Sequence, residues 1–166
     1  MTIADLNAAG RDAFAAAIGF AFERSPWIAE AAWSARPFRD ADELHARMMA
    51  VVAAAPEDAR LALIRAHPEL RCGLPAPELT PASRDEQQAS RLRTLASDDA
   101  AEFAALQKTY RDRFGFPFVI CVRNYEPSAV LAELRRRTVR DRSEEIAAAI
   151  AEIGEIARLR VRSALA

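Results

Sequence analysis

Residues 40–56 read DADELHARMMAVVAAAP, and this stretch decides the fold class. Leu44, Met48 and a valine one turn later follow one another at the spacing that gathers apolar side chains on one face of an α-helix. Asp40 provides an N-cap at the start of the run, and Pro56 ends it. The pattern therefore predicts an amphipathic helix.

The helical period continues along most of the chain. Residues 71–79 interrupt it with one glycine and two prolines, which predicts a loop. A chain of 166 residues is long enough for one domain with a core of its own. We therefore expect an all-α fold, a single-domain irregular helical bundle that spans residues 1–166. The further helices are predicted over residues 11–22, 26–35, 56–66, 80–95, 97–114, 127–138 and 143–161.

The composition predicts no partner that is recognised through overall charge. The formal net charge is −1, so no overall field attracts nucleic acid or an anionic membrane. No uncharged run reaches the roughly 18 residues of a membrane span, and the N-terminus lacks the basic start of a secretory signal. We therefore expect a cytoplasmic protein. Cys72 and Cys121 form no CxxC motif, which predicts reduced thiols and, with only two histidines in the chain, no metal site.

The sequence IRAHPEL, residues 64–70, places His67 directly before Pro68. Because a proline biases the preceding residue away from the helical region, His67 is expected at the exit of a helix. One interpretation is structural, since an imidazolium suits the negative end of a helix dipole. The other is chemical, since imidazole exchanges protons near neutral pH. A thiol–imidazole pair with Cys72 is not expected, because the intervening proline turn does not direct the two side chains together.

Residues 83–87 read SRDEQ and follow a predicted helix start at Thr80. Ser83, Glu86 and Gln87 are spaced at i, i+3 and i+4, which brings them to one face near the helix N-terminus. Ser-x-x-Glu is also the capping-box pattern. Because Thr80 already supplies a cap, the polar side chains are available for a polar or anionic ligand.

Residues 114–123, FGFPFVICVR, interrupt the helical pattern a second time. Pro117 lacks an N–H donor and Gly115 adds backbone freedom, so the stretch predicts a short extended segment. In a helical protein such a segment has no neighbouring strand, and its buried backbone groups must find other partners. The segment is either a buried connector or a place where an amide-rich ligand completes the hydrogen bonds.

In this order and at these intervals, AHPEL, SRDEQ and RFGFPFVICVR resemble the motifs of the OHCU decarboxylase family. The abbreviation denotes 2-oxo-4-hydroxy-4-carboxy-5-ureidoimidazoline, a late intermediate of urate breakdown. The resemblance covers almost the whole chain, as far as EIARLRV near the C-terminus. It implies an all-helical, cofactor-free enzyme of purine catabolism that converts this small molecule to (S)-allantoin and CO2, and it implies a homodimer.

The resemblance also implies roles for individual residues. His67 is expected to be the principal catalytic acid–base residue, and Glu86 the second catalytic group. Two alternatives stay open: a decarboxylase of a related ureido or imidazolone acid, and a non-catalytic helical interaction module in which the motifs are only caps and core. The implied substrate-binding residues are Pro68, Ser83, Arg84, Asp85, Glu86, Gln87, Phe118, Val119, Ile120, Cys121, Val122 and Arg160.

Overall fold

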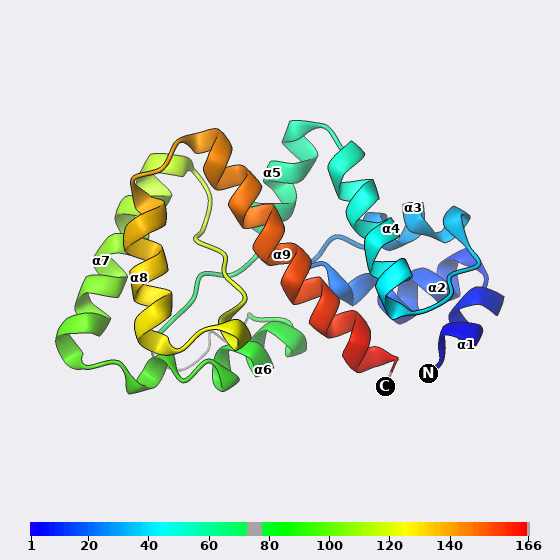
Figure 1. The fold of residues 1–166 in the computed structure, drawn as a ribbon, viewed down its shortest axis with the longest axis horizontal. Helices are drawn as coiled ribbons and strands as arrows, with labels where there is room; N and C mark the ends of the chain where they lie inside the picture. The colour runs from blue at the N-terminus through cyan, green and yellow to red at the C-terminus, as the bar shows by residue number, and fades with distance from the viewer. Residues whose placement is uncertain (73–77, 166) are drawn as a thin grey trace. The chain divides into compact units, whose positions relative to one another are not determined.

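The computed structural model describes residues 1–72 and 78–165, and this part of the chain consists of helices joined by turns (Figure 1). No residue of these two ranges belongs to a strand, and the predicted all-α class is confirmed. None of the helices in these ranges combines the length and apolarity that crossing a bilayer requires. The α-helices are α1 (Ile3–Ala8), α2 (Arg11–Ile18), α3 (Trp27–Ala32), α4 (Ala41–Ala54), α5 (Glu57–Ala66), α6 (Pro81–Ala89), α7 (Ser97–Phe114), α8 (Pro127–Thr138) and α9 (Arg142–Ala164), and the 3₁₀ turns are η1 (Gly19–Ala21), η2 (Trp33–Ala35), η3 (Leu92–Thr94) and η4 (Val122–Asn124).

Helix ends agree with the sequence signals where a cap is present. The carboxylate of Asp40 accepts a hydrogen bond from the Glu43 N–H at 2.8 Å, which starts α4 as predicted. The helix predicted over residues 80–95 is wrong beyond Ala89, because Arg91 adopts a left-handed backbone with φ of 53° before η3 begins. Helix α1 was not predicted. It has only six residues, of which Leu6 alone is buried, and so short a segment shows no apolar stripe in the sequence. Residues 73–77 of the predicted loop lie outside the described residues.

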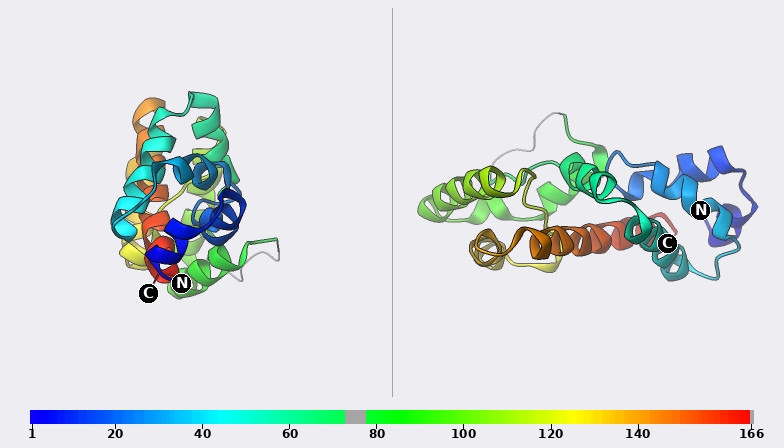
Figure 2. Two further views of the ribbon diagram at one scale, coloured as in Figure 1. Left: turned by 90° about the vertical axis from the view of Figure 1, so that its right-hand side faces the viewer. Right: turned by 90° about the horizontal axis from the view of Figure 1, so that it is seen from above.

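The chain divides into two compact units, residues 1–66 with 154–166, and residues 67–153. The single domain spanning residues 1–166 stays a prediction, and each unit is described by itself. In the first unit, α2, α3 and α4 pack together (Figures 1 and 2). Gly154 of α9 lies against Met49 of α4, where an added Cβ would come within 3.0 Å of the methionine Cε. The apolar core of this unit includes Phe14, Ile18, Phe22, Ile28, Leu44, Met48, Val52, Ala157 and Val161.

His45 lies on α4 in the first unit, and its Nε2 is 2.9 Å from the carbonyl oxygen of Gly154. Because a carbonyl oxygen only accepts, Nε2 carries the proton of the neutral ring. Burial lowers the pKa of His45 below its ordinary 6.5, and this effect outweighs the opposing contributions of the hydrogen bond and of Glu155. The unfolded chain therefore binds a proton at this residue at a higher pH than the folded chain does.

We expect the contribution of His45 to the free energy of unfolding to be complete above pH 6.5, the ordinary pKa. It should be lost as the pH falls through the lowered pKa of the folded state, because the unfolded state then binds more protons. His45→Gln, whose amide can still donate to Gly154, should flatten this dependence. Urea unfolding at about pH 7.5 and about pH 5.5 measures it. The same loss of stability in both proteins would contradict the assignment.

The second unit is organised by α7 and α8, which lie side by side (Figure 1). The ring of Tyr110 on α7 contacts two phenylalanines of the FGFPF sequence. Its centroid is 4.7 Å from that of Phe114 and 5.4 Å from that of Phe118. Gly115 ends α7 in the left-handed conformation, with φ of 76°, where a residue without a Cβ is favoured. The phenylalanines of FGFPF therefore anchor the turn into the core.

A buried polar cluster joins three helices of this unit. Tyr110 of α7 donates to Glu145 Oε1 of α9 at 2.5 Å, and the Arg137 Nε of α8 donates to the same oxygen at 2.6 Å. Glu145 is 0% exposed and Arg137 is 1% exposed. Burial raises the pKa of Tyr110, and the hydrogen bond to Glu145 adds to this, so the phenol stays protonated and donates. The cluster is a fully desolvated ion pair with a third hydrogen-bonding partner.

Candidate functional site

His67 is the first residue after α5, as Pro68 predicted. The side chain is not at the surface: His67 is 6% exposed, and its Nε2 atom is buried. Pro68 is half-buried beside it. The helix therefore ends at a buried imidazole, a group that can bind or release a proton near neutral pH.

Helix α6 starts as its sequence predicted. Pro81 is at its first turn, and the Thr80 hydroxyl accepts a hydrogen bond from the Ser83 N–H at 3.3 Å. Thr80 is therefore the N-cap, and Ser83 lies inside the helix rather than at the capping position. Ser83 and Gln87 are buried and Glu86 is half-buried.

Arg84 and Asp85 lie between these residues in sequence but are both exposed. A helix separates the side chains at i+1 and i+2 from those at i, i+3 and i+4. Their exposure gives no support to a substrate contact at either residue, whereas the burial of Ser83 and Gln87 supports one.

Gln87 joins the two motifs. Its Nε2 donates to the backbone oxygen of Glu69 at 3.0 Å, two residues after His67. Its Oε1 is buried and has no hydrogen-bond partner among the described residues. Helix α6 also packs against η4, which includes the last two residues of the FGFPFVICVR stretch. The second unit thus brings together the exit of α5, the polar face of α6 and the end of the third motif.

The segment from Phe118 to Val122 is buried along its length, and residues 117–121 have no regular secondary structure. Side chains from helices take the place of a neighbouring strand. Arg137 Nη1 donates to the Val119 carbonyl oxygen at 2.8 Å, and the Cys121 N–H donates to Glu152 Oε2 at 2.8 Å. The guanidinium of Arg137 also stacks over the ring of Phe118, 4.6 Å from its centroid.

Sequence reasoning missed these partners of the segment. A signal was present for Arg137, because it follows Val130 and Leu134 at helical spacing and so occupies the buried stripe of α8. Glu145, which binds Arg137 and not the segment itself, likewise precedes the buried Ala149 and Ile153 at intervals of four. A charged residue in an apolar stripe indicates a buried polar partner, although the stripe does not identify that partner.

Arg160 belongs to the first unit, where it is 5% exposed. Its Nη1 lies 3.2 Å from Glu23 Oε2 and donates to the Phe20 carbonyl oxygen at 3.2 Å. These contacts fix the guanidinium within that unit. Its role as a substrate contact stays a prediction.

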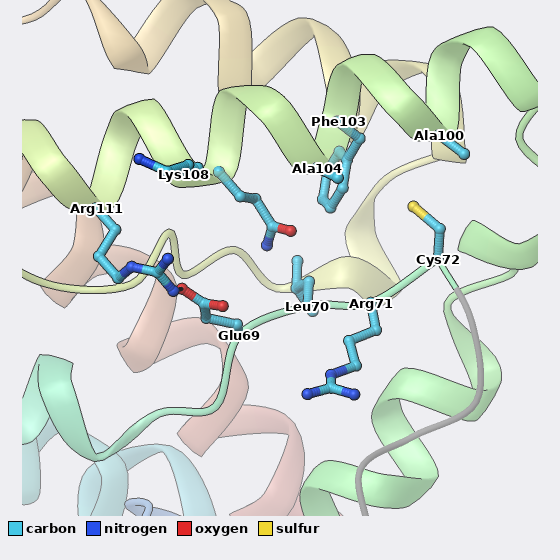
Figure 3. Close-up of a pocket in the computed structure, with 10 residues that line it drawn as sticks. Glu69, Leu70, Arg71, Cys72, Ala100, Phe103, Ala104, Lys108 and Arg111 are labelled. Carbon is cyan, nitrogen blue, oxygen red and sulfur yellow. Dashed lines mark hydrogen bonds and ion pairs between the residues drawn. The ribbon is translucent and has the colours of Figure 1, made fainter.

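A pocket of about 260 Å³ lies between residues 69–72 and α7 (Figure 3). Glu69 pairs with Arg111 across one end at 2.5 Å, and Cys72 directs its sulfur toward α7 at the other. None of the predicted site residues lines this pocket. Burial raises the pKa of the Cys72 thiol, which disfavours the nucleophilic thiolate. No group of three potential metal-ligating side chains occurs in residues 1–72 and 78–165.

The buried imidazole at the exit of α5 and the carboxylate, amide and hydroxyl side chains of α6 are groups typical of enzymes that work by acid–base chemistry. Comparison with known proteins gives the particular class. A model of the OHCU decarboxylase family matches residues 7–162. The chain belongs to this family, and the prediction of a carboxy-lyase is confirmed.

Similar proteins support this assignment over nearly the full length. The chain is 40% identical to a 2-oxo-4-hydroxy-4-carboxy-5-ureidoimidazoline decarboxylase of Haloferax volcanii over 161 residues, which are 97% of this chain and 94% of the other. It is 36% identical to one of Bos taurus, with coverage of 99% and 98%. A crystal structure of (S)-allantoin synthase has a TM-score of 0.81 and 28% identity, and the match covers 99% of this chain and 54% of that one.

Proposed function

We propose that this protein converts 2-oxo-4-hydroxy-4-carboxy-5-ureidoimidazoline to (S)-allantoin and CO2, a step of urate degradation. The observation that carries the proposal is the buried position of the Gln87 amide and its hydrogen bonding. This amide, 8% exposed, ties α6 to the backbone two residues beyond His67 while its own carbonyl oxygen keeps no protein partner among the described residues. A buried acceptor of this kind favours a ligand that carries N–H groups, as a ureido compound does.

The proposed decarboxylation needs no cofactor to accept the electron pair, because the substrate itself can accept it. The substrate has a carboxylate on a carbon that bears a hydroxyl and adjoins an imine carbon. When the C–C bond to the carboxylate breaks, CO2 leaves and its bonding electron pair remains in the ring, where the imine absorbs it. A proton must then reach one face of the ring carbon, because delivery to both faces would give racemic allantoin.

The residues of the second unit divide this work. We assign His67 as the acid–base residue that moves protons at the hydroxyl and the ring, and Glu86 as its electrostatic partner or the group that engages the hydroxyl. Ser83, Gln87 and the backbone of residues 118–122 hold the substrate, which is a positioning task. Arg160 is proposed as a further contact to the carboxylate.

Two further properties belong to this proposal. We propose that the protein is a homodimer, which the family resemblance supports, and that it is cytoplasmic, as the sequence predicted. We also propose that the enzyme acts without nucleic acid or membrane, and the formal net charge of −1 supports this because it supplies no general attraction for anionic polymers or lipids.

Circular dichroism of freshly generated substrate tests the reaction. The wild-type protein is expected to produce the (S)-allantoin signal faster than the spontaneous decay, which yields a racemate and no signal. A rate equal to the spontaneous one would contradict the proposed substrate. Turnover of a related ureido or imidazolone acid in the same assay would then show that the fold serves a different decarboxylation.

A further inference from the structure

The hydrogen bonds around Ile120 determine the directions of its two peptide groups. The Val119 carbonyl oxygen accepts from Arg137, and the Cys121 N–H donates to Glu152. The two peptide bonds that flank Ile120 are trans. In a trans peptide the C=O and N–H of one unit point in opposite directions. The Ile120 N–H therefore points away from Arg137, and the Ile120 carbonyl points away from the Glu152 carboxylate.

The groups that hold these peptides are themselves fixed. Arg137 is buried and bound to Glu145, which also accepts from Tyr110. Glu152 Oε1 accepts a hydrogen bond from the Tyr125 hydroxyl at 3.0 Å. Burial, supported by this hydrogen bond, raises the pKa of Tyr125 to about 12, so the phenol remains a donor at neutral pH. Each contact to the segment is thus part of a chain of hydrogen bonds, which restricts its movement.

Neither the N–H nor the C=O of Ile120 has a protein partner among the described residues, although the residue is 2% exposed. Buried backbone groups are normally paired. A charge-assisted hydrogen bond on the far side of a peptide also polarises it, so the Ile120 N–H becomes a better donor and its C=O a better acceptor. One donor and one acceptor on a single residue match an amide or ureide edge, which offers one of each.

We propose that Glu152 and Arg137 are positioning residues for the reaction: they orient the peptides on either side of Ile120 so that its N–H and C=O bind a ureide edge of the substrate. This inference rests on the proposed function. It assigns Glu152 and Arg137 an effect on substrate binding that acts through the backbone, and neither side chain is required to touch the substrate.

Glu152 gives the cleaner test, because Arg137 also belongs to the buried ion pair. Glu152→Ala removes the acceptor of the Cys121 N–H, whereas Glu152→Gln keeps a side-chain oxygen at that place. Glu144→Ala, at an exposed glutamate of the same helix, is the control. We expect Glu152→Ala to lower kcat/KM about tenfold, mainly through KM, with Glu152→Gln within about twofold of wild type. The control should behave as wild type.

Amide exchange measured by NMR gives a second readout that is independent of turnover. Adding (S)-allantoin should protect the Ile120 amide in wild type and in Glu152→Gln, but not in Glu152→Ala. The inference would be overturned if Glu152→Ala kept the wild-type kcat/KM and (S)-allantoin still protected its Ile120 amide. It would also be overturned if Glu152→Gln lowered kcat/KM as much as Glu152→Ala does. If wild type shows no decarboxylation, the proposed function fails separately. Protection of Ile120 by (S)-allantoin would then still support the positioning of this segment, and its absence would overturn it.

Discussion

His67→Ala is expected to lower the rate of (S)-allantoin formation by about 10²–10⁴, the usual contribution of a positioned acid–base group. His67 is buried at the exit of α5, where alanine would leave no group able to exchange a proton. The stereochemical outcome should change as well. If His67 controls proton delivery to one face, the residual product should approach the racemate. Following the circular dichroism signal together with total allantoin separates rate from stereochemistry.

His45→Gln is the matched control, because His45 is the other histidine of the chain and lies on α4 in the first unit. It should keep the wild-type rate at neutral pH, where His45 is uncharged in the folded protein. A His67→Ala protein as fast and as stereospecific as wild type would exclude His67 as the acid–base residue. The assignment would then move to Glu86.

Arg137→Leu should reduce the free energy of unfolding by about 3–5 kcal/mol, because it leaves a fully buried carboxylate without its cation. Glu145 is 0% exposed, so water cannot replace the lost partner. For a protein of this length, the loss corresponds to a decrease of roughly 6–20 °C in Tm. Urea unfolding and thermal melts, both followed by far-ultraviolet circular dichroism, measure these two quantities.

The double variant Arg137→Leu with Glu145→Leu distinguishes a lost attraction from an uncompensated charge. Replacing both charged residues by apolar ones is often close to neutral, since neither charge then has to be desolvated. The double variant should therefore recover a large part of the loss, except for two hydrogen bonds: the one that Tyr110 gives to Glu145 and the one that Arg137 gives to the Val119 carbonyl oxygen. A double variant less stable than the single one would show that the ion pair is itself strongly stabilising.

Local sequence signals predicted the parts of the candidate site that lie on one stretch of chain. The Thr80 cap and the helical spacing placed Ser83, Glu86 and Gln87 on one face of the helix. In the structure Ser83 and Gln87 are buried and Glu86 is half-buried. Pro68 placed His67 at a helix exit for a reason that involves only adjacent residues. These predictions succeeded because capping and helix termination depend on residues within about one turn.

The sequence by itself determined the all-α class, since an apolar period of about 3.6 residues is a property of neighbouring positions along the chain. Only the tertiary structure decided which side chains bind the buried backbone of residues 118–122. Glu152 is 31 residues from Cys121, and Arg137 is 18 residues from Val119, yet each binds a backbone group of the buried segment of residues 118–122. Such partners are determined by how helices pack, because a buried peptide group must be satisfied by whichever polar side chain the packing brings to it.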